Sequence, residues 1–310
     1  MGSLRIVQAA GVAVDQNLAP DNDVVWHHDY VDDLPVCAEH WFGPVTQPCG
    51  TDAIELRFAF DGKTACRFVV SPDGRGVRST SVGWLSDQDL NRLFYDVVMR
   101  AVYSAMDLPS FHASALVKDG KALMIMGDKG RGKSTLSGAL RLIGWEVLAD
   151  DLVGVVEHEG RWSAIHGQGE SKLNDDSARA LGLNLESLGR QWFHATPTDP
   201  QKHIFLQSAD ATADDTPVPV AHLIFLDRRG ADVDSVRVED CRTAEGIMHL
   251  LQNVTADFSG TRQRPSSNMR NAAGGLASQA RMLRLSMPDD LARLRDAARE
   301  VDDRLMRGNG

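Results

Sequence analysis

The sequence predicts an α/β protein in which a small β-rich N-terminal region (residues 1–104) precedes a larger domain with a mixed sheet (residues 105–310). Three observations support this fold class. A glycine-rich loop at residues 127–134 lies between an apolar run and a helical segment, an order typical of α/β domains. Short alternating segments near residue 60 flank an Asp-Gly pair, which predicts a β-hairpin. Residues 86–106 change to helical spacing.

The bulk composition is that of an ordinary soluble globular protein, with 43% hydrophobic and 25% charged residues among 310. The net charge of −10 and the pI near 5.4 argue against a nucleic-acid carrier, because such proteins present a broad basic surface. The first twenty residues lack a secretory signal, and no apolar run approaches the roughly 18 residues that span a membrane. We therefore expect a cytoplasmic protein with no nucleic-acid or membrane partner.

The four cysteines, Cys37, Cys49, Cys66 and Cys241, contain no C-x-x-C pair and predict no zinc site. A reduced compartment is the simpler interpretation, and a Cys37–Cys49 disulfide stays open as the alternative. The six tryptophans are scattered, which favours core or pocket packing over a stacking platform for nucleic acid.

The N-terminal region is expected to begin with weakly ordered residues 1–20. Residues 55–60 and 65–70 alternate apolar and polar side chains and predict the two strands of the hairpin. Residues 86–106 then predict a helix, and Ser86 or Asp87 is placed to cap its start.

The segments around the glycine-rich loop follow the order strand, loop, helix, strand. Residues 113–117 and 122–126 predict a second hairpin that leads into the loop, and residues 134–142 predict the helix after it. Residues 145–149 predict the next strand, which residues 152–156 either continue or pair alongside.

The C-terminal half contains fewer clear elements. Residues 165–219 are polar, and we expect little regular structure there beyond a short helix at 176–188. The remaining expectations are a strand at 222–226, helices at 243–254 and 288–306, and a long mobile loop at 256–275.

The loop fits Gly-x-x-x-x-Gly-Lys-[Ser/Thr], the phosphate-binding P-loop pattern. Its glycines allow successive backbone N–H groups to face a polyphosphate, and the following helix adds its positive end. Lys133 would reach the β and γ oxygens, and the Ser134 hydroxyl would approach Mg²⁺. We therefore expect ATP and Mg²⁺ as ligands. The expected nucleotide-binding residues are Gly127, Asp128, Lys129, Gly130, Arg131, Gly132, Lys133, Ser134 and Thr135.

A second carboxylate is needed to hold Mg²⁺ or accept a proton. Asp150 and Asp151 end the strand after the loop's helix, and the C-terminal ends of strands in a β-α-β unit face one crevice. We expect both to be catalytic, with Asp151 beside Ser134 at the metal, and which of the two is the base stays open. Asp227 is the other candidate, but a turn after a core strand is the favoured interpretation there.

The run Phe-His-Ala-Ser-Ala at 111–115, then the hairpin and loop, then Ala149-Asp150-Asp151, resembles the HPr kinase/phosphorylase family, particularly lasso-peptide kinases. The resemblance covers residues 105–156, with weaker similarity near 172 and in 217–226. It implies a P-loop core related to phosphoenolpyruvate carboxykinase and phosphorylation of a serine hydroxyl in a peptide or protein, such as a lasso-type precursor. It also implies a multimer.

The same resemblance implies roles for single residues. Lys133 and Ser134 would serve ATP and Mg²⁺, Asp150 or Asp151 would be the base, and His112 would lie beside the phosphates. The second glycine-rich signature of that family is absent, so reverse phosphorylase activity is not expected. The region before residue 105 does not resemble that family's N-terminal domain.

Two other functions stay open. One is a kinase of a small-molecule hydroxyl, which the same site would serve. The other is a regulatory ATP-binding switch, in which Asp227 would be the Walker B carboxylate. An ABC-type ATPase and a GTPase are disfavoured because neither Leu-Ser-Gly-Gly-Gln nor Asn-Lys-x-Asp is present. The identity of the acceptor stays undetermined.

Five further polar residues are weaker candidates. Lys172 and Lys202 would neutralise a transferring phosphoryl group and Glu170 would add a metal ligand, but a solvated side chain is favoured for each. Arg262 and Arg264 lie in the expected loop, where they would close over ATP or bind an acidic substrate. Loop arginines are usually solvated, and they are left out of the core site.

Overall fold

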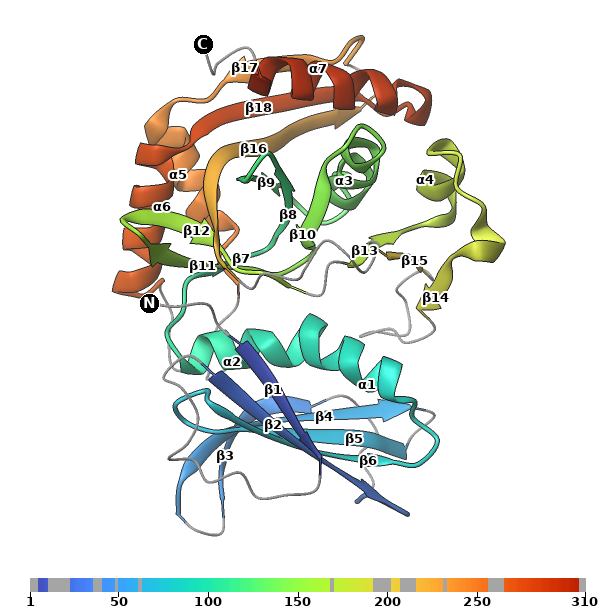
Figure 1. Ribbon diagram of the computed structural model, residues 1–310, viewed down its shortest axis with the longest axis vertical. Helices are drawn as coiled ribbons and strands as arrows, with labels where there is room; N and C mark the ends of the chain where they lie inside the picture. The colour runs from blue at the N-terminus through green and yellow to red at the C-terminus, as the bar shows by residue number, and fades with distance from the viewer. Residues whose placement is uncertain are drawn as a thin grey trace. The chain divides into compact units, whose positions relative to one another are not determined.

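The computed structural model describes residues 5–10, 23–35, 41–47, 50–60, 63–167, 170–191, 202–206, 216–230, 233–255 and 265–306. The chain divides into two compact units, residues 1–110 with 255–268 and residues 111–254 with 269–310. Each unit combines strands with helices, so the predicted α/β class is confirmed (Figure 1). Within the described ranges no helix is long and apolar enough to cross a membrane.

The first unit contains a six-stranded sheet in the order β1-β2-β6-β5-β4-β3. Its strands are β1 (Arg5–Ala10), β2 (Asp23–Val31), β3 (Trp41–Thr46), β4 (Asp52–Phe60), β5 (Lys63–Val70) and β6 (Gly76–Val82). The predicted hairpin is β4–β5, with Phe58 opposite Cys66. The expectation of weak order at the start is wrong for Arg5–Ala10, which pairs in parallel with β2. Cys37 and Cys49 lie outside the described residues.

The predicted helix at 86–106 is confirmed as α1 (Asp87–Leu93), a π-helical turn η1 (Phe94–Val98) and α2 (Met99–Ala105). The Ser86 hydroxyl caps it by accepting the amide of Asp89 at 3.2 Å. The indole of Trp26 stacks on Phe94 with ring centroids 4.2 Å apart. This buried pair joins the helix to β2.

The second unit contains a nine-stranded mixed sheet in the order β10-β8-β9-β16-β12-β11-β7, and β18 pairs with both β16 and β17. Its strands are β7 (Ser110–Phe111), β8 (Ala113–Lys118), β9 (Lys121–Met126), β10 (Glu146–Ala149), β11 (Val153–His158), β12 (Arg161–Ala164), β16 (Val218–Gly230), β17 (Arg237–Asp240) and β18 (Arg281–Pro288). Strands β9, β16 and β18 are parallel, so their C-terminal ends meet at one edge.

The predicted hairpin at 113–126 is β8–β9, and Asp119 and Gly120 both have positive φ at its two-residue turn. Helix α3 (Lys133–Arg141) leads from β9 to β10, as predicted. Strand β10 pairs antiparallel with β8 and therefore runs in the same direction as β9, with β8 between them. The glycine-rich loop after β9 and the aspartate pair after β10 consequently emerge at the same edge.

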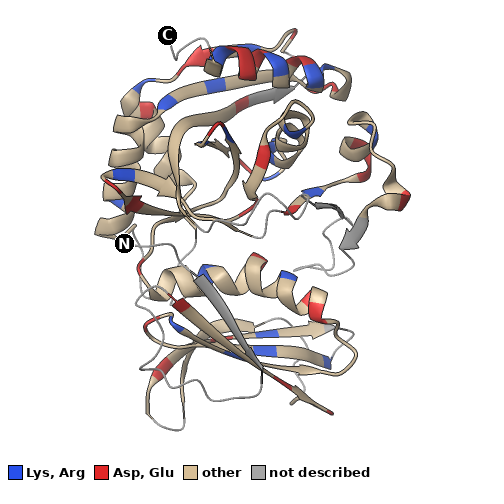
Figure 2. Cartoon of the chain, viewed as in Figure 1, with Lys and Arg blue, Asp and Glu red and all other residues tan. Residues whose placement is uncertain are grey.

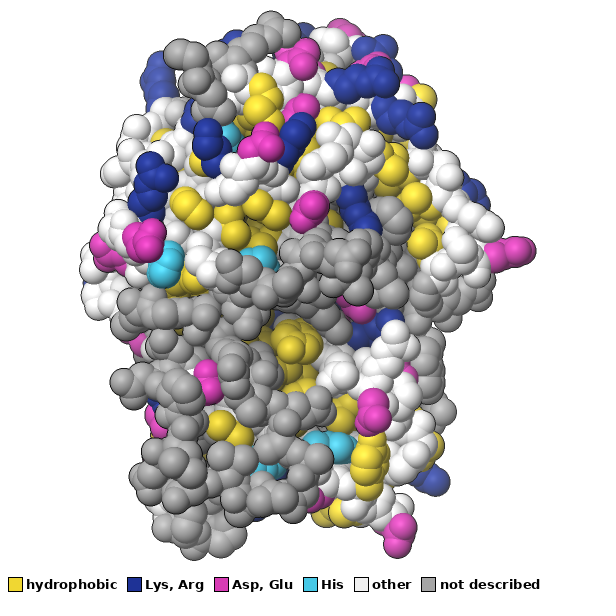
Figure 3. Space-filling model, in the orientation of Figure 1, with side chains coloured by type: hydrophobic (Ala, Val, Ile, Leu, Met, Phe, Trp, Pro, Cys, Tyr) yellow, Lys and Arg dark blue, Asp and Glu magenta, His cyan; other side chains and the backbone are white. Residues whose placement is uncertain are grey.

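Helices cover both faces of this sheet (Figure 1). Along β9, Leu123 and Ile125 pack in the core with α3 and α7 (Leu294–Met306), whereas Met124 and Met126 pack in the opposite core with α5 (Thr243–Gln252) and α6 (Ser267–Gln279). The outer side of α7 carries charged residues of both signs (Figure 2). Basic and acidic side chains both appear across the face drawn in Figure 3.

The expectation of a loop across 256–275 is wrong from Ser267 onward, where α6 begins. The polar start and two glycines of this segment do not indicate a helix by periodicity, but its buried face is mostly alanine. This face is formed by Ala272, Ala273, Leu276 and Ala277. Residues 256–264 lie outside the described residues.

The expectation of little regular structure in 165–219 is also wrong. Strands β13 (Glu170–Leu173), β15 (Lys202–Leu206) and β14 (Gly189–Gln191) form a three-stranded sheet in that order. The predicted short helix is α4 (Asp175–Ala180), followed by the 3-10 turn η2 (Leu185–Ser187). The strands are short and pair across a long stretch of chain, so no local periodicity marks them.

Two strand boundaries differ from the predictions. Residues 152–156 neither continue β10 nor pair with it, because β11 pairs with β12 after Asp151 turns the chain at φ 66°. Strand β16 does not end at Asp227 but continues to Gly230 beside β18.

Candidate functional site

The glycine-rich loop has a backbone that depends on its glycines. Gly130 and Gly132 have φ values of 84° and 97°, which other residues rarely adopt. At Gly127 a Cβ atom would lie 2.9 Å from Cβ of Leu226 in the neighbouring strand β16. The first glycine is therefore required for space, and the other two for conformation.

Helix α3 begins directly after this loop with Gly132 as its N-cap, and no side chain caps it. The first N–H groups of any helix have no partner within the helix, and they lie at the positive end of the helix dipole. The loop and the first turn of α3 thus provide backbone donors suited to an anion.

Lys133, in the first turn of α3, is only 6% exposed. Its Nζ atom donates to the carbonyl oxygen of Gly127 at 2.7 Å and lies 3.0 Å from Nε2 of His112. The carbonyl oxygen of Asp128 is a weaker third acceptor at 3.5 Å. These contacts hold the ammonium group at the loop.

His112 lies between β7 and β8, and its amide donates to the carbonyl oxygen of Asn253 at 2.7 Å. Its Nδ1 atom lies 3.0 Å from the carbonyl oxygen of Asp151, which can only accept. We therefore assign the proton to Nδ1, and Nε2 then accepts from Lys133. His112 links the aspartate pair to the loop lysine.

Asp150, directly after β10, lies between the loop helix and β8. Its Oδ1 atom accepts hydrogen bonds from the hydroxyl of Ser114, from the amide of Asp151 at 3.2 Å and from the hydroxyl of Ser134 at 3.4 Å. Ser134 follows Lys133 in the first turn of α3. The carboxylate thus lies beside the N-terminal end of α3, where the backbone donors are.

The other oxygen of Asp150 faces β13. Oδ2 accepts the amide of Lys172 at 3.2 Å and the hydroxyl of Ser171 at 3.4 Å. Ser171 is fully buried and Lys172 is 6% exposed. The interpretation of Lys172 as a solvated surface residue is therefore wrong, because β13 packs it beside the aspartate.

Burial of its carboxylate and the neighbouring Asp151 raise the pKa of Asp150 above its usual range. The hydrogen bonds from Ser114 and from the Lys172 amide, and the Lys172 charge, oppose this shift in the pKa but do not cancel it. Two adjacent carboxylates of this kind are stabilised by a cation or a proton, which is typical of functional sites.

Among the described residues, no group of three or more His, Cys, Asp or Glu side chains forms a metal cage. The available donors are instead the Ser134 hydroxyl and the Asp150 carboxylate. Mg²⁺ is usually held in this way, by one or two carboxylates together with substrate phosphates and water. The donor set therefore fits magnesium brought in with a polyphosphate.

The structure brings together His112, Lys133, Ser134, Asp150 and Asp151 from the predicted site, all within the second unit. Sequence reasoning missed Ser114 and Ser171 as partners of Asp150. Ser114 lies in the run Phe-His-Ala-Ser-Ala at 111–115, two residues after His112. Ser171 lies far along the chain, and no local pattern pointed to it.

The remaining predicted nucleotide-binding residues have diverse surroundings. Asp128 and Arg131 form an exposed ion pair at 3.7 Å. The hydroxyl of Thr135 bonds that of Ser177 in α4 at 2.9 Å, which leaves its amide at the start of α3 as the group able to meet a phosphate.

Asp227 lies within β16, not after it. Burial lowers the pKa of Arg284, but the carboxylates of Glu245, Asp227 and Glu239 raise it, and the net shift of this pKa is upward. Asp227 thus contributes to a charged group around β18, whereas Asp150 is the carboxylate bonded to Ser134. Glu170 is half-buried at the start of β13. The Lys202 side chain and both Arg262 and Arg264 lie outside the described parts of the chain.

No family model matches the chain, and no curated protein matches it. A solved structure, the Hpr(Ser) kinase/phosphatase from Coxiella burnetii, is similar with 15% identity and a TM-score of 0.30. The match covers 65% of this chain and 99% of that chain. The features of this chain that bear on its function are therefore the glycine-rich loop and the Asp150 cluster.

Proposed function

We propose that this protein is a Mg²⁺- and ATP-dependent phosphotransferase that phosphorylates a serine hydroxyl of a peptide or protein, such as a lasso-type precursor. One observation carries the proposal. The Ser134 hydroxyl, in the uncapped first turn of α3, lies 3.4 Å from Oδ1 of Asp150. A helix end with backbone donors suited to an anion and a buried carboxylate are thus next to each other, and this pairing supports a role in phosphoryl transfer.

The phosphates would bind the backbone N–H groups from Gly127 to Thr135, with Lys133 neutralising their charge. Lys133 already points at the loop, because its ammonium group contacts Gly127. On binding, it would donate to charged phosphate oxygens, which form stronger hydrogen bonds than carbonyl oxygens do.

Magnesium would be held by the Ser134 hydroxyl and Asp150, and it would supply neutralisation of phosphate charge. The sequence favoured Asp151 for this role. The proposal assigns it to Asp150 because the Ser134 hydrogen bond joins these two side chains. Ser114, Ser171 and the Lys172 amide hold both carboxylate oxygens in place.

Asp151 would accept the proton of the acceptor serine as that hydroxyl oxygen bonds to the γ-phosphorus and ADP leaves. The backbone of Asp151 fixes His112, and His112 fixes Lys133. One hydrogen-bond chain therefore joins the backbone of the proposed base to the loop lysine. The same proposal includes a peptide substrate, a cytoplasmic location and a homo-oligomeric assembly.

The test is transfer of labelled γ-phosphate, with Mg²⁺, to serine-containing peptides encoded in the same genomic neighbourhood. Asp151→Asn is the informative variant. Asp119→Asn is its matched control, because Asp119 also has positive φ, at 52° against 66°, but lies in the β8–β9 turn. We expect Asp151→Asn to lower turnover about 100-fold or more and to bind ATP normally.

Label in a peptide serine with the wild type and Asp119→Asn only would support the proposal. ATP binding without label in any peptide would contradict the serine-kinase assignment and favour a small-molecule acceptor or a nucleotide switch. No ATP binding at all would refute the nucleotide site itself.

A further inference from the structure

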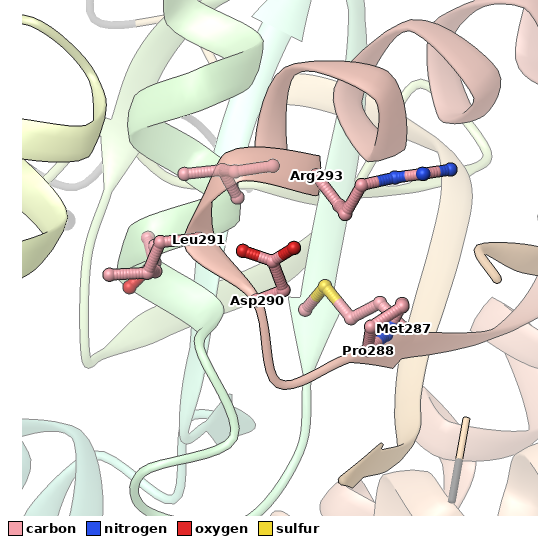
Figure 4. Close-up of a pocket in the computed structure, with 7 residues that line it drawn as sticks. Met287, Pro288, Asp290, Leu291 and Arg293 are labelled. Carbon is pink, nitrogen blue, oxygen red and sulfur yellow. The ribbon is translucent and has the colours of Figure 1, made fainter. Parts of the chain in front are cut away.

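The hollow at the C-terminal end of β18 is lined in part by Met287, Pro288 and, in the turn η4 (Leu291–Arg293), Leu291 (Figure 4). Once open solvent is left out, it has room for about one water molecule. It is therefore too small for a nucleotide or a peptide side chain. The charged surface that the fold does not explain lies in the first unit, on one face of its sheet.

The two faces of this six-stranded sheet differ in character. Phe68 in β5 lies on the face that the helix covers, because its ring lies beside that of Phe94 in η1, with centroids 6.5 Å apart. Side chains alternate along a strand, so the neighbouring Arg67 lies on the opposite face. One face of the sheet is thus apolar and the other carries charge.

Three arginines come together on the charged face, from three adjacent strands. Arg57 of β4 lies directly opposite Arg67 of β5. Two residues further along β5, Val69 lies between Glu55 of β4 and Arg78 of β6. Diagonal neighbours of this kind, such as Arg67 and Arg78, are about 7–8 Å apart at the backbone. We call Arg57, Arg67 and Arg78 the arginine face, and Figure 2 shows basic segments on neighbouring strands of this sheet.

Two of these arginines share one buried carboxylate. The Nε atoms of Arg57 and Arg67 donate to Oε1 of Glu55 at 2.6 and 2.5 Å. Burial raises the pKa of Glu55, but the hydrogen bonds and charges of the two arginines lower it, and the net shift of this pKa is downward. The side chain of Glu55 is fully buried, and its Oε2 atom accepts no hydrogen bond within the described part of the chain.

This arrangement costs stability. Like charges placed directly opposite each other on neighbouring strands repel, and a buried carboxylate oxygen without a donor carries a desolvation penalty. Residues that weaken a fold in this way are found mainly where a protein binds or reacts. The arginine face is therefore a candidate binding surface.

The arginine face is accessible and positively charged. The side chains of Arg57 and Arg67 are 41% and 44% exposed, and Arg78 is exposed as well. Three arginines against the single carboxylate of Glu55 leave an excess of positive charge, in a chain whose net charge is −10. At its border, the ring of Trp41 is 38% exposed and lies 5.3 Å from the guanidinium carbon of Arg57. Exposed Trp and Arg side chains are typical of protein-binding surfaces.

We infer that the arginine face binds an acidic segment of the polypeptide substrate, an inference that rests on the proposed function. In an extended peptide alternate side chains lie on one side, about 7 Å apart. This spacing matches that of Arg67 and Arg78, so acidic residues at alternate positions would each meet one arginine. A guanidinium group binds a carboxylate through two charge-assisted hydrogen bonds. The arginine face belongs to the first unit and the Asp150 cluster to the second, so this contact would act on substrate affinity.

The experiment measures binding of a labelled peptide, in which Glu alternates with Gly, by fluorescence anisotropy in the absence of ATP. The same peptide with Gln in place of Glu is the uncharged probe. Arg78→Gln is the informative variant, because Arg78 takes no part in the hydrogen bonds that hold Glu55. Arg237→Gln is its matched control, since Arg237 is an exposed arginine on β17 of the second unit. Arg67→Gln is a second variant, and urea unfolding checks that it is folded.

We expect Arg78→Gln and Arg67→Gln each to weaken binding of the Glu peptide about 3- to 10-fold, with Arg237→Gln close to wild type. The Gln peptide should bind more weakly than the Glu peptide at low salt, and added salt should reduce this difference. Equal binding of the two peptides, or an equal loss in Arg78→Gln and Arg237→Gln, would overturn the inference. An oligonucleotide of equal charge that bound more tightly than the Glu peptide would overturn it in favour of a nucleic-acid site.

Failure of this inference and failure of the proposed function are distinguishable, because the binding assay contains no nucleotide. Loss of peptide binding in Arg78→Gln, with no phosphate transfer to any peptide by the wild type, would support the arginine face as a peptide site and contradict the kinase. Phosphate transfer to a peptide serine with unchanged binding in Arg78→Gln would support the kinase and overturn the role of the arginine face.

Discussion

The Nζ atom of Lys133 lies 3.0 Å from Nε2 of His112, whose Nδ1 atom lies 3.0 Å from the carbonyl oxygen of Asp151. A single imidazole thus bridges the loop lysine and the backbone of the aspartate pair. The bridge requires a neutral His112 with its proton on Nδ1, because the carbonyl oxygen can only accept.

Lys133→Ala should weaken ATP binding at least about 10-fold and abolish transfer, because it removes the buried cation that we propose neutralises the phosphates. Calorimetric titration with Mg-ATP measures the affinity. Lys121→Ala, on the exposed side of the β8–β9 turn, is the control. Wild-type affinity in Lys133→Ala would exclude this loop as the phosphate site.

Asp150→Asn should raise the Mg²⁺ concentration needed for half-maximal transfer about 10-fold or more, because it removes the charged oxygen bonded to Ser134. Asp151→Asn should leave this concentration within about 3-fold of wild type while lowering kcat. Rates measured across a Mg²⁺ series separate the two effects. The opposite pattern would indicate that Asp151 binds the metal, as the sequence predicted.

His222 should make stability fall as the pH drops. Burial in β16, followed by the charges of Lys121 and Arg281, lowers its pKa from 6.5 to about 4. The unfolded chain therefore binds a proton near pH 6.5 and the folded chain only near pH 4, so stability decreases as pH is lowered through this window. Urea unfolding measures this effect. Between about pH 7 and pH 5, the free energy of unfolding of His222→Gln should fall by about 1–2 kcal/mol less than that of the wild type. Equal losses would contradict this role of His222.

Gly275→Ala and Gly274→Ala, neighbours in α6, should change stability in opposite directions. A Cβ atom at Gly275 would lie 1.9 Å from Nε1 of Trp162, whereas one at Gly274 meets nothing within 4 Å. We expect Gly275→Ala to lower the free energy of unfolding by about 1–3 kcal/mol and Gly274→Ala to raise it by about 0.5–1 kcal/mol. Chemical denaturation measures both, and similar values for the pair would show that Trp162 moves freely.

Elements with a strong local signal were predicted well. The hairpins at 55–70 and 113–126 have short turns and alternating side chains, and the helix at 86–106 has a capping serine. Elements that depend on distant pairing were missed, including β18 and the small sheet that contains β13. Helix α6 was read as a loop because its buried face consists mostly of alanine.

The sequence by itself determined the α/β class and a set of candidate site residues that share one edge of a sheet, since the run from 111 to 151 is nearly continuous and its turns are locally encoded. Only the tertiary structure decided the surroundings of Asp150. Ser171 and Lys172 reach it from β13, about twenty residues further along the chain, and they set its burial and its raised pKa. Local patterns encode turns and periodicity, whereas the environment of a carboxylate depends on which distant strands pack around it.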